Sequence, residues 1–215
     1  MQIFSWKICS GLIPIILVVT MSVASAAAES SRILVLGDSL VAGYGLAEQE
    51  AFPNQLEQEL QSAGYKVQVI NAGVSGDTTA GGLSRLDWAL VDRPHIAIIV
   101  LGGNDALRGL PPEETRRNLD KIIVRLKQER VAILLTGMRA PRNFGSDYYN
   151  KFDRLYPELA IQHGVAFYRF FLAEVATVSQ YNQADGIHPN PQGVKMIVRQ
   201  ISPVIKEMLE DLPAP

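Results

Sequence analysis

Five short apolar runs recur along the chain, and helical patterns separate them. The runs are rich in Val, Ile and Leu without strict polar alternation, as expected for strands buried on both faces of a sheet. They span residues 33–36, 66–70, 96–101, 131–136 and 165–168. Because strand and helix alternate throughout, the sheet should be mostly parallel, with helices on both of its faces. The pattern therefore predicts an α/β fold of three layers, α/β/α, around a five-stranded sheet.

The helical patterns between these runs have the lengths that such a fold requires. They span residues 52–63, 78–91, 113–129, 147–163 and 191–209. Gly64 and Gly164 follow two of them, where a glycine that ends a helix belongs. Trp88 falls on the apolar stripe of the second helix, so we expect it in the core. We expect a flavodoxin-like domain, for which 2-1-3-4-5 is the common order of five strands.

The first 28 residues read as a secretory signal peptide. Lys7 precedes an apolar stretch over residues 8–21, and small residues follow it. Cleavage after Ala26 or after Ala28 satisfies the small-x-small rule. The alternative is an uncleaved membrane anchor, but the stretch is short and Gly11 and Pro14 interrupt it. Residues 29–215 show no repeat or linker and are expected to form a single domain.

Composition excludes several classes of function. The only cysteine, Cys9, lies in the segment that is removed, so the mature chain should contain neither disulfide nor free thiol. The formal charge of −2 becomes −3 once Lys7 leaves. Since there is no basic run and aromatic residues are sparse, nothing indicates binding to nucleic acid.

Polar residues follow the predicted strands in four loops. Ser39 lies in the turn Gly37-Asp38-Ser39-Leu40 directly after the first strand, and Gly73 lies in the segment 71–77 after the second. Asn104 follows the third strand, and Asp185 and His188 precede the last helix. Because ligands and chemistry gather at the carboxyl ends of the strands of an α/β sheet, one edge can collect all of these residues.

These residue types supply what ester cleavage requires. A serine nucleophile needs a histidine that takes its proton and an acid that orients the histidine. His188 and Asp185 stand three residues apart, close enough for a carboxylate to meet the imidazole. The developing oxyanion needs fixed donors, and the candidates are the N–H groups of Ser39 and Gly73 and the amide of Asn104.

Each of these residues also has a structural explanation. Asp38 is expected to cap or brace its turn rather than to act in catalysis. Alone, Gly73 would be a turn glycine and Asn104 a helix cap or turn residue. A common turn pair begins at Asp185, and His188 precedes a proline at a helix entry. His95 and His163 have no evident partner, so we expect packing or surface roles for them.

Together the four loops resemble those of the SGNH (GDSL) hydrolases. The matching residues are Gly37 to Leu40, Gly73, Gly102-Gly103-Asn104-Asp105 and Asp185-Gly186-Ile187-His188-Pro189. The resemblance implies a nucleophile at Ser39, a general base at His188 oriented by Asp185, and oxyanion donors at Ser39, Gly73 and Asn104. It extends over the whole mature chain. Residues 71–79 and 107–110 are similar to a bacterial periplasmic subgroup of multifunctional thioesterase, arylesterase and lysophospholipase. Val41 stands where the α/β-hydrolase nucleophile elbow has its second glycine, so that family does not fit.

The expected surroundings of Ser39 are apolar and suit acyl chains better than sugars. The candidate substrate-binding residues are Leu40, Leu107, Leu110, Phe144 and Ile187. The irregular segments 137–146 and 171–190 are candidates for the rims of the site, and the resemblance implies that residues 107–112 shift when an acyl chain binds. The expected substrates are small acyl esters and thioesters.

Two alternatives remain at this point. One is a carbohydrate or peptidoglycan O-acetylesterase of the same family, which would need a polar, narrow site. The other is a flavodoxin-like module that binds phosphate at a helix start, which leaves Asp185 and His188 unexplained. Neither cofactor nor metal is expected, because Asp185 and His188 lack further ligands at metal spacing. We expect a monomer without a stable membrane anchor, located in the periplasm of a Gram-negative bacterium or secreted.

Overall fold

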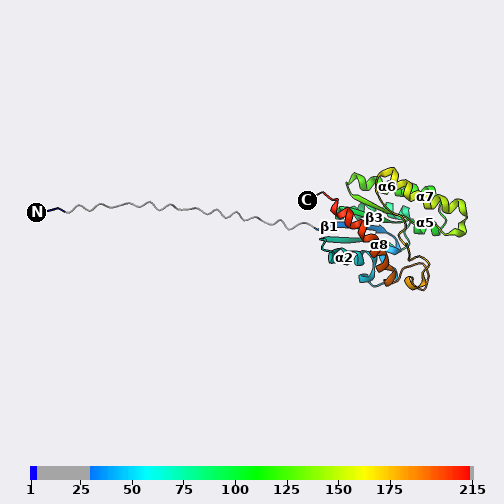
Figure 1. The fold of residues 1–215 in the computed structure, drawn as a ribbon. Coiled ribbons are helices and arrows are strands. Elements are labelled where there is room, and N and C mark those ends of the chain that lie inside the picture. The colour runs from blue at the N-terminus through cyan, green and yellow to red at the C-terminus, as the bar shows by residue number, and fades with distance from the viewer. Residues whose placement is uncertain (4–29, 214–215) are drawn as a thin grey trace.

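The structure, a computed structural model, describes residues 1–3 and 30–213 (Figure 1). Both predicted cleavage positions of the signal peptide, after Ala26 and after Ala28, lie outside the described residues. Among the helices of the described part, none is both long and apolar enough to span a membrane.

All five predicted strands form, and they pair in parallel in the order β2-β1-β3-β4-β5. Their bounds are β1 Ser31–Gly37, β2 Val67–Gly73, β3 Ile96–Val100, β4 Ala132–Thr136 and β5 Ala166–Tyr168. The predicted strand order is confirmed. Since β1 lies between β2 and β3, the loop after β1 is flanked by the loops after those two strands.

Helices cover both faces of this sheet. The α-helices are α1 Ser39–Ala42, α2 Phe52–Ser62, α3 Thr79–Ser84, α4 Leu86–Ala89, α5 Gly103–Leu107, α6 Pro112–Gln128, α7 Ser146–His163 and α8 Pro191–Glu210. Short 3₁₀ helices are η1 Glu48–Glu50, η2 Leu90–Asp92, η3 Arg142–Phe144 and η4 Ser179–Tyr181. Helices α2 and α8 pack together on one face, and α6 and α7 pack on the other (Figure 1). The three-layer fold is therefore as predicted.

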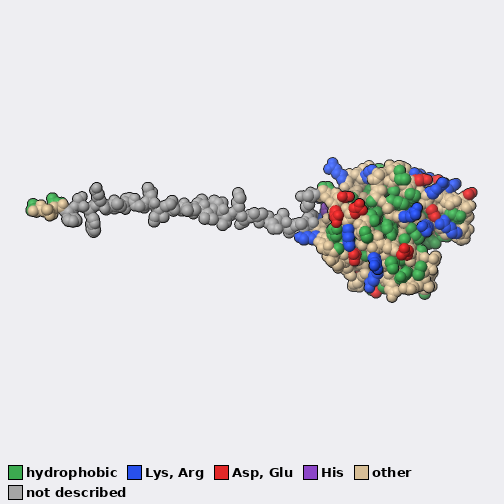
Figure 2. Space-filling view, in the orientation of Figure 1, with side chains coloured by type: hydrophobic (Ala, Val, Ile, Leu, Met, Phe, Trp, Pro, Cys, Tyr) green, Lys and Arg blue, Asp and Glu red, His purple; other side chains and the backbone are tan. Residues whose placement is uncertain are grey.

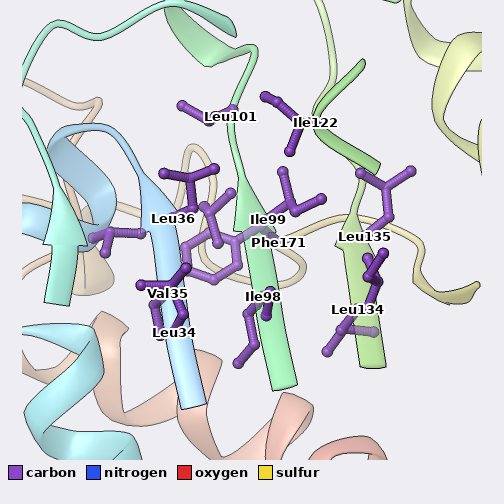
Figure 3. Close-up of a cluster of buried hydrophobic side chains, with 14 of the residues drawn as sticks. Leu34, Val35, Leu36, Ile98, Ile99, Leu101, Ile122, Leu134, Leu135 and Phe171 are labelled. Atoms are coloured by element: carbon purple, nitrogen blue, oxygen red, sulfur yellow. The ribbon is translucent and has the colours of Figure 1, made fainter. Parts of the chain in front are cut away.

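The core is built on the central strands. Every residue of β3 is completely buried, as expected for a strand that helices cover on both faces. Figure 3 shows side chains of β1, β3 and β4 gathered with Leu101, Ile122 and Phe171 from three other segments. Such close packing holds the ends of these strands in fixed positions, and those ends carry the loops with the polar residues.

One helix differs from the prediction. The expected helix over residues 78–91 is broken at Arg85, whose φ of −109° and ψ of 6° end α3 and start α4. The break changes the phase of the helical stripe, so Leu86 and Ala89 face the core while Trp88 is 74% exposed. The prediction that Trp88 lies in the core is wrong for this reason.

The second strand is longer than its apolar run. It continues through Asn71 and Ala72 to Gly73, which pairs with Gly37 at the end of β1. Ladder pairing with β1 thus extends β2 over residues whose side chains suggest a loop. Gly73 lies at the last position of the strand rather than inside the following loop.

The surface carries charges of both signs. Figure 2 shows Lys and Arg interspersed with Asp and Glu on the visible face. On that face, Lys and Arg do not form the continuous basic band with which a protein binds a nucleic acid backbone.

Candidate active site

The candidate nucleophile stands in the turn between β1 and α1. Gly37 ends β1 in close contact with the next turn, since a Cβ on Gly37 would lie 2.2 Å from Val41 Cγ2 and 2.9 Å from the Val100 carbonyl oxygen. Asp38 then caps α1, its Oδ1 accepting a hydrogen bond of 3.0 Å from the Leu40 N–H. Ser39 is the first residue of the helix. The expected capping role of Asp38 is confirmed.

Ser39, His188 and Asp185 form a continuous hydrogen-bonded chain. Ser39 Oγ lies 2.9 Å from His188 Nε2, and His188 Nδ1 lies 2.6 Å from Asp185 Oδ2. With the proton on Nδ1, His188 donates to the carboxylate and its Nε2 accepts from the serine hydroxyl. The fold thus brings Ser39 and His188, which are 149 residues apart in the sequence, into the arrangement that activates a serine.

The loop around Asp185 fixes this carboxylate from two sides. Its Oδ1 accepts hydrogen bonds from the N–H groups of Ile187 at 2.9 Å and His188 at 3.0 Å. Together with the ring of His188, these bonds hold the pKa of Asp185 down at about 2. The carboxylate is therefore charged over the whole pH range in which a histidine works as a base.

Two further residues hold the histidine loop against the serine turn. The rings of Tyr44 and His188 lie 4.6 Å apart, tilted by 38°. Gln183 Nε2 donates to the carbonyl oxygens of Tyr44 at 2.7 Å and Pro189 at 3.0 Å. Neither Tyr44 nor Gln183 was identified from the sequence, because no motif or spacing marks a contact between these two loops.

Asn104 lies beside the serine turn, as predicted. Its Nδ2 donates to the Asp77 carbonyl oxygen at 2.9 Å and to Asp38 Oδ2 at 3.2 Å. Asp38 is only 2% exposed, and this burial raises its pKa to about 6. The side chain of Asp38 thus contacts both the helix start and the amide of Asn104.

The three predicted oxyanion donors differ in their availability. The Ser39 N–H has no acceptor within the described residues. The Gly73 N–H donates to Asn71 Oδ1 at 3.0 Å, so it is engaged in this structure. Gly76, three residues further on, has a φ of +84°, and its N–H donates no hydrogen bond within the described part of the chain.

Gly73 has a packing role that explains the residue type. A Cβ at this position would lie 2.2 Å from the Ala42 nitrogen and 2.7 Å from the Val41 carbonyl carbon. Both are backbone atoms, which cannot move aside as the end of a side chain can. Only glycine lets the end of β2 approach α1 this closely.

Asp105 accepts hydrogen bonds from residues at the starts of two neighbouring helices. It is 1% exposed and accepts hydrogen bonds from the Thr79 N–H at 2.9 Å and the Thr79 hydroxyl at 2.5 Å. The hydroxyl of Thr115 on α6 adds a third bond at 3.2 Å. The starts of α3, α5 and α6 are therefore joined at one buried carboxylate.

A cavity of about 270 Å³ opens at Ser39 and His188. Of the five predicted substrate-binding residues, Leu40, Leu107 and Ile187 line it. The other two do not: the Leu110 carbonyl oxygen accepts a bond from Tyr148, and the Phe144 ring packs against the ring of Tyr148. Its remaining lining residues are Asp38, Gly103, Asn104, Met138, Arg139, Pro141, Phe170, Leu172, Ala176, Thr177 and Gly186.

Most of the lining that sequence reasoning missed comes from two irregular segments. Met138, Arg139 and Pro141 follow β4, and Leu172, Ala176 and Thr177 follow β5. These segments were predicted as rims, and the structure confirms this. Arg139, whose guanidinium lies 4.5 Å from the centre of the Phe170 ring, is the one Lys or Arg among the lining residues.

Other parts of the described chain offer no comparable site. A larger hollow of about 620 Å³ lies at the opposite edge of the sheet, between residues such as Arg32, Pro94 and Val131, and contains neither Ser39 nor His188. His95 Nδ1 accepts from the Arg32 N–H, and His163 contacts Asp120, so both have structural partners. Residues 1–3 and 30–213 contain no group of three acidic, His or Cys residues placed to hold a metal ion.

Comparison with known proteins agrees with this geometry. Residues 35–196 match the GDSL-like lipase/acylhydrolase family. The chain belongs to this family. It is 38% identical to the esterase TesA of Pseudomonas aeruginosa over 85% of this chain and 91% of the relative. It is also 36% identical to thioesterase 1/protease 1/lysophospholipase L1 of Escherichia coli K12, over 95% of this chain and 96% of the relative.

Solved structures of the family share the fold. The esterase EstA from Pseudoalteromonas, in a crystal structure inhibited by monoethylphosphonate, superposes with a TM-score of 0.80 at 30% identity, over 85% of this chain and 100% of that one. The flavodoxin-like sandwich of three layers thus belongs to a GDSL-like hydrolase.

Proposed function

We propose that this protein is a serine hydrolase that cleaves carboxylic esters and thioesters of acyl chains through an acyl-enzyme intermediate. The observation that carries the proposal is the chain of hydrogen bonds from Ser39 through His188 to Asp185 at the mouth of an apolar cavity. Relatives named esterase, arylesterase and thioesterase/lysophospholipase support ester cleavage.

The proposed reaction has two halves. Ser39 Oγ attacks the acyl carbonyl carbon while its proton passes to His188 Nε2. The C–O or C–S bond then breaks as His188 donates that proton to the leaving oxygen or sulfur, and the acyl group stays on Ser39 as an ester. In the second half, water attacks this ester and gives its proton to His188, which returns it to Ser39 as the carboxylic acid leaves.

Ser39, at the start of α1 after β1, and Asn104, in α5 after β3, are two of our proposed oxyanion donors. The Ser39 N–H donates to no acceptor among the described residues, and the longer of the two bonds made by Asn104 Nδ2, that to Asp38, is the one to be exchanged for the oxyanion. The third donor was predicted at Gly73, and that assignment requires the Asn71 side chain to turn away. Gly76 requires no such change, and we propose its N–H as the third donor instead.

The lining of the cavity supports acyl chains as substrates. Leucine, methionine, phenylalanine and isoleucine side chains surround the serine, and Arg139 is the one Lys or Arg among the lining residues. A volume of about 270 Å³ is small for a ligand pocket. An acyl group of modest length fits it as it stands, and longer chains require residues 107–112 to shift, as the family resemblance implies. The phosphate-binding alternative leaves the hydrogen bonds of His188 and Asp185 without a purpose.

We also propose that residues 1–28 direct export and that the enzyme works as residues 29–215 in the periplasm of a Gram-negative bacterium or outside the cell. The proposal rests on the signal-peptide pattern of the sequence.

Labelling with a fluorophosphonate probe tests the reaction class. We expect stoichiometric labelling of Ser39 in the wild-type protein, no labelling of Ser39→Ala and strongly reduced labelling of His188→Ala. Ser62→Ala, at an exposed position on α2, is the matched control and should label normally. A folded wild-type protein that does not label, or Ser39→Ala that labels fully, contradicts the proposal.

Hydrolysis of p-nitrophenyl esters from acetyl to palmitoyl tests the substrate class. We expect kcat/KM to rise from acetyl to chains that fill the cavity. A sharp preference for acetyl would instead indicate the O-acetylesterase alternative.

A further inference from the structure

Arg85 makes contacts that the proposed reaction does not yet explain. It occupies the break between α3 and α4, and its side chain is 18% exposed. Its Nε donates to Asp77 Oδ2 at 2.6 Å. Its two terminal nitrogens donate to backbone carbonyl oxygens, Nη1 to Ala72 at 2.9 Å and Nη2 to Gly37 at 2.8 Å. One guanidinium thus joins the ends of β1 and β2 and the loop that follows β2.

Each of these acceptors lies within two residues of an oxyanion donor predicted from the sequence or proposed above. The Gly37 carbonyl stands two residues before Ser39, at the start of the serine turn. Asp77 follows Gly76 directly, and its own carbonyl oxygen accepts the amide of Asn104 at 2.9 Å. The Ala72 carbonyl belongs to the same peptide unit as the Gly73 N–H. The N–H donors therefore all lie on segments that bind the Arg85 guanidinium. The remaining donor, the Asn104 amide, binds the carbonyl oxygen of Asp77 on one of these segments.

The ion pair between Arg85 and Asp77 is closely packed, so its side chains have little room to move. A Cβ on Gly81 of α3 would lie 2.4 Å from Asp77 Oδ1, so the helix packs directly against the carboxylate. The carboxylate in turn orients the guanidinium, which is a planar fork with five donors. Lysine has a single ammonium group and cannot address three acceptors in fixed directions in this way.

We propose that Arg85 is a positioning residue for the oxyanion hole. It sets the spacing between the serine turn, the end of β2 and the loop that carries Gly76, and so holds the donors where the oxyanion forms. The inference rests on the proposed hydrolase function. Oxyanion stabilisation depends on donors fixed before the reaction, and a misplacement of about 1 Å can cost about 10²-fold in rate. Substrate binding in the cavity depends on other side chains, because Arg85 does not line it.

Arg85→Lys tests the proposal through its separate effects on kcat and KM. With p-nitrophenyl butyrate we expect kcat to fall about 10- to 100-fold while KM stays within about 3-fold, since the variant misplaces donors used only in the transition state. Arg125→Lys is the matched control, because Arg125 also pairs with a carboxylate on this part of the chain, Asp87, but contacts no catalytic loop. Its kcat should be that of the wild type.

Asp77→Asn provides a second, independent variant. It removes the charge that orients Arg85 and should lower kcat in the same way, by a smaller factor. If Arg85→Lys does not fold, as judged by circular dichroism and thermal unfolding, Asp77→Asn decides. A folded variant of either kind with unchanged kcat, or one that changes KM as much as kcat, overturns the proposal.

A double-mutant cycle with Asn104→Ala separates this inference from the proposed function. If Arg85 acts through the oxyanion hole, Arg85→Lys should cost several-fold less in kcat once Asn104 is absent. Fully additive effects overturn the inference and leave the hydrolase function standing. Unchanged activity in Ser39→Ala overturns the function itself, whatever Arg85 does.

Discussion

Asp185 is held as a permanent anion by hydrogen bonds that all come from its own loop. The N–H groups of Ile187 and His188 and the ring of His188 lower its pKa to about 2. In the proposed mechanism it accepts a hydrogen bond from the Nδ1–H of His188, which leaves Nε2 free to take the proton of Ser39. Its charge does not change in the range where the enzyme works, so its contribution is to orient the ring and to stabilise the imidazolium.

Asp185→Asn should therefore lower kcat by about 10²- to 10⁴-fold while KM stays within about 3-fold, because the amide favours the wrong tautomer of His188. The measurement is kcat between pH 5 and pH 9. Since Asp185 does not titrate in this range, the loss should be present at every pH. Asp92→Asn, at an exposed position in η2, is the control and should match the wild type. A variant that recovers at high pH would show that Asp185 acts by another route.

The pKa of Asp38 is raised, whereas that of Asp185 is lowered. Burial raises its pKa from 3.8 to about 6, so the folded protein keeps a proton that the unfolded chain has already released. The stabilisation from this proton is fully present below about pH 4 and is lost as the pH rises through 6. The difference in pKa corresponds to about 3 kcal/mol.

This predicts a pH-dependent difference between the wild type and Asp38→Asn, whose amide carries no charge. The free energy of unfolding in urea should fall by about 2 kcal/mol more in the wild type than in the variant between pH 4 and pH 7. The variant keeps an oxygen for the Leu40 N–H, so the cap itself is not the cause. Parallel pH profiles of the two proteins would contradict the assignment.

At the scale of single residues, the side chains of the proposed catalytic triad could be identified from the sequence but their neighbours could not. Ser39, Asp185 and His188 were predicted because each follows or precedes a recognisable element and supplies a necessary part of one reaction. Tyr44 and Arg85 carry no such signal, since their contacts join segments that only the folded chain brings together. Phe144 does not line the cavity in this structure, since its ring packs on Tyr148, a contact that its own loop does not reveal.

At the scale of elements, the ends of β1 and β2 set the geometry of the site. Their register pairs Gly37 with Gly73, so the serine turn and the end of β2 lie side by side. Hydrophobic periodicity predicted every strand, because β1, β3 and β4 are mostly buried and the outer strands β2 and β5 pack partly buried residues against the same core. It could not predict the extension of β2 to Gly73 or the break at Arg85, because hydrogen bonds to distant backbone groups cause both.

Gly73→Ala tests the contact between β2 and α1. The new methyl group would lie 2.2 Å from the Ala42 nitrogen, so the strand end and the serine turn must separate. We expect a loss of about 1–3 kcal/mol in the free energy of unfolding and a fall of at least about 10-fold in kcat. Thermal unfolding and the p-nitrophenyl butyrate assay measure the two effects.

Gly64→Ala is the control for this variant. Gly64 has a φ of +92° but no atom within 4 Å of an added Cβ, so alanine strains the backbone without a clash. It should lose about 1 kcal/mol of stability and retain its kcat. If Gly73→Ala lowered the free energy of unfolding but left kcat unchanged, the close approach of β2 to α1 would have no effect on catalysis.

At the scale of the whole molecule, a rigid sheet collects its chemistry at one edge. The loops after β1, β2 and β3 and the loop before α8 supply Ser39, Gly76, Asn104 and His188, and the segments after β4 and β5 supply much of the cavity wall. The buried β3 lies at the centre of this arrangement. Loops can vary around such a scaffold without loss of the fold, because stability resides in the core.

If residues 1–28 are removed as we propose, that core stabilises the remaining chain without disulfides. Cys9 is the only cysteine and lies within the proposed signal peptide, so residues 29–215 contain none. Expression of residues 29–215 in a reducing cytoplasm should therefore give a folded enzyme with the kcat/KM of the exported form. Its thermal midpoint should agree within about 2 °C with and without reductant, which is less than a loss of about 1 kcal/mol produces in a domain of this size. Mass spectrometry of the exported form should show an amino terminus at Ala27 or Glu29. An aggregated or inactive cytoplasmic form would mean that folding needs the segment we assign to export.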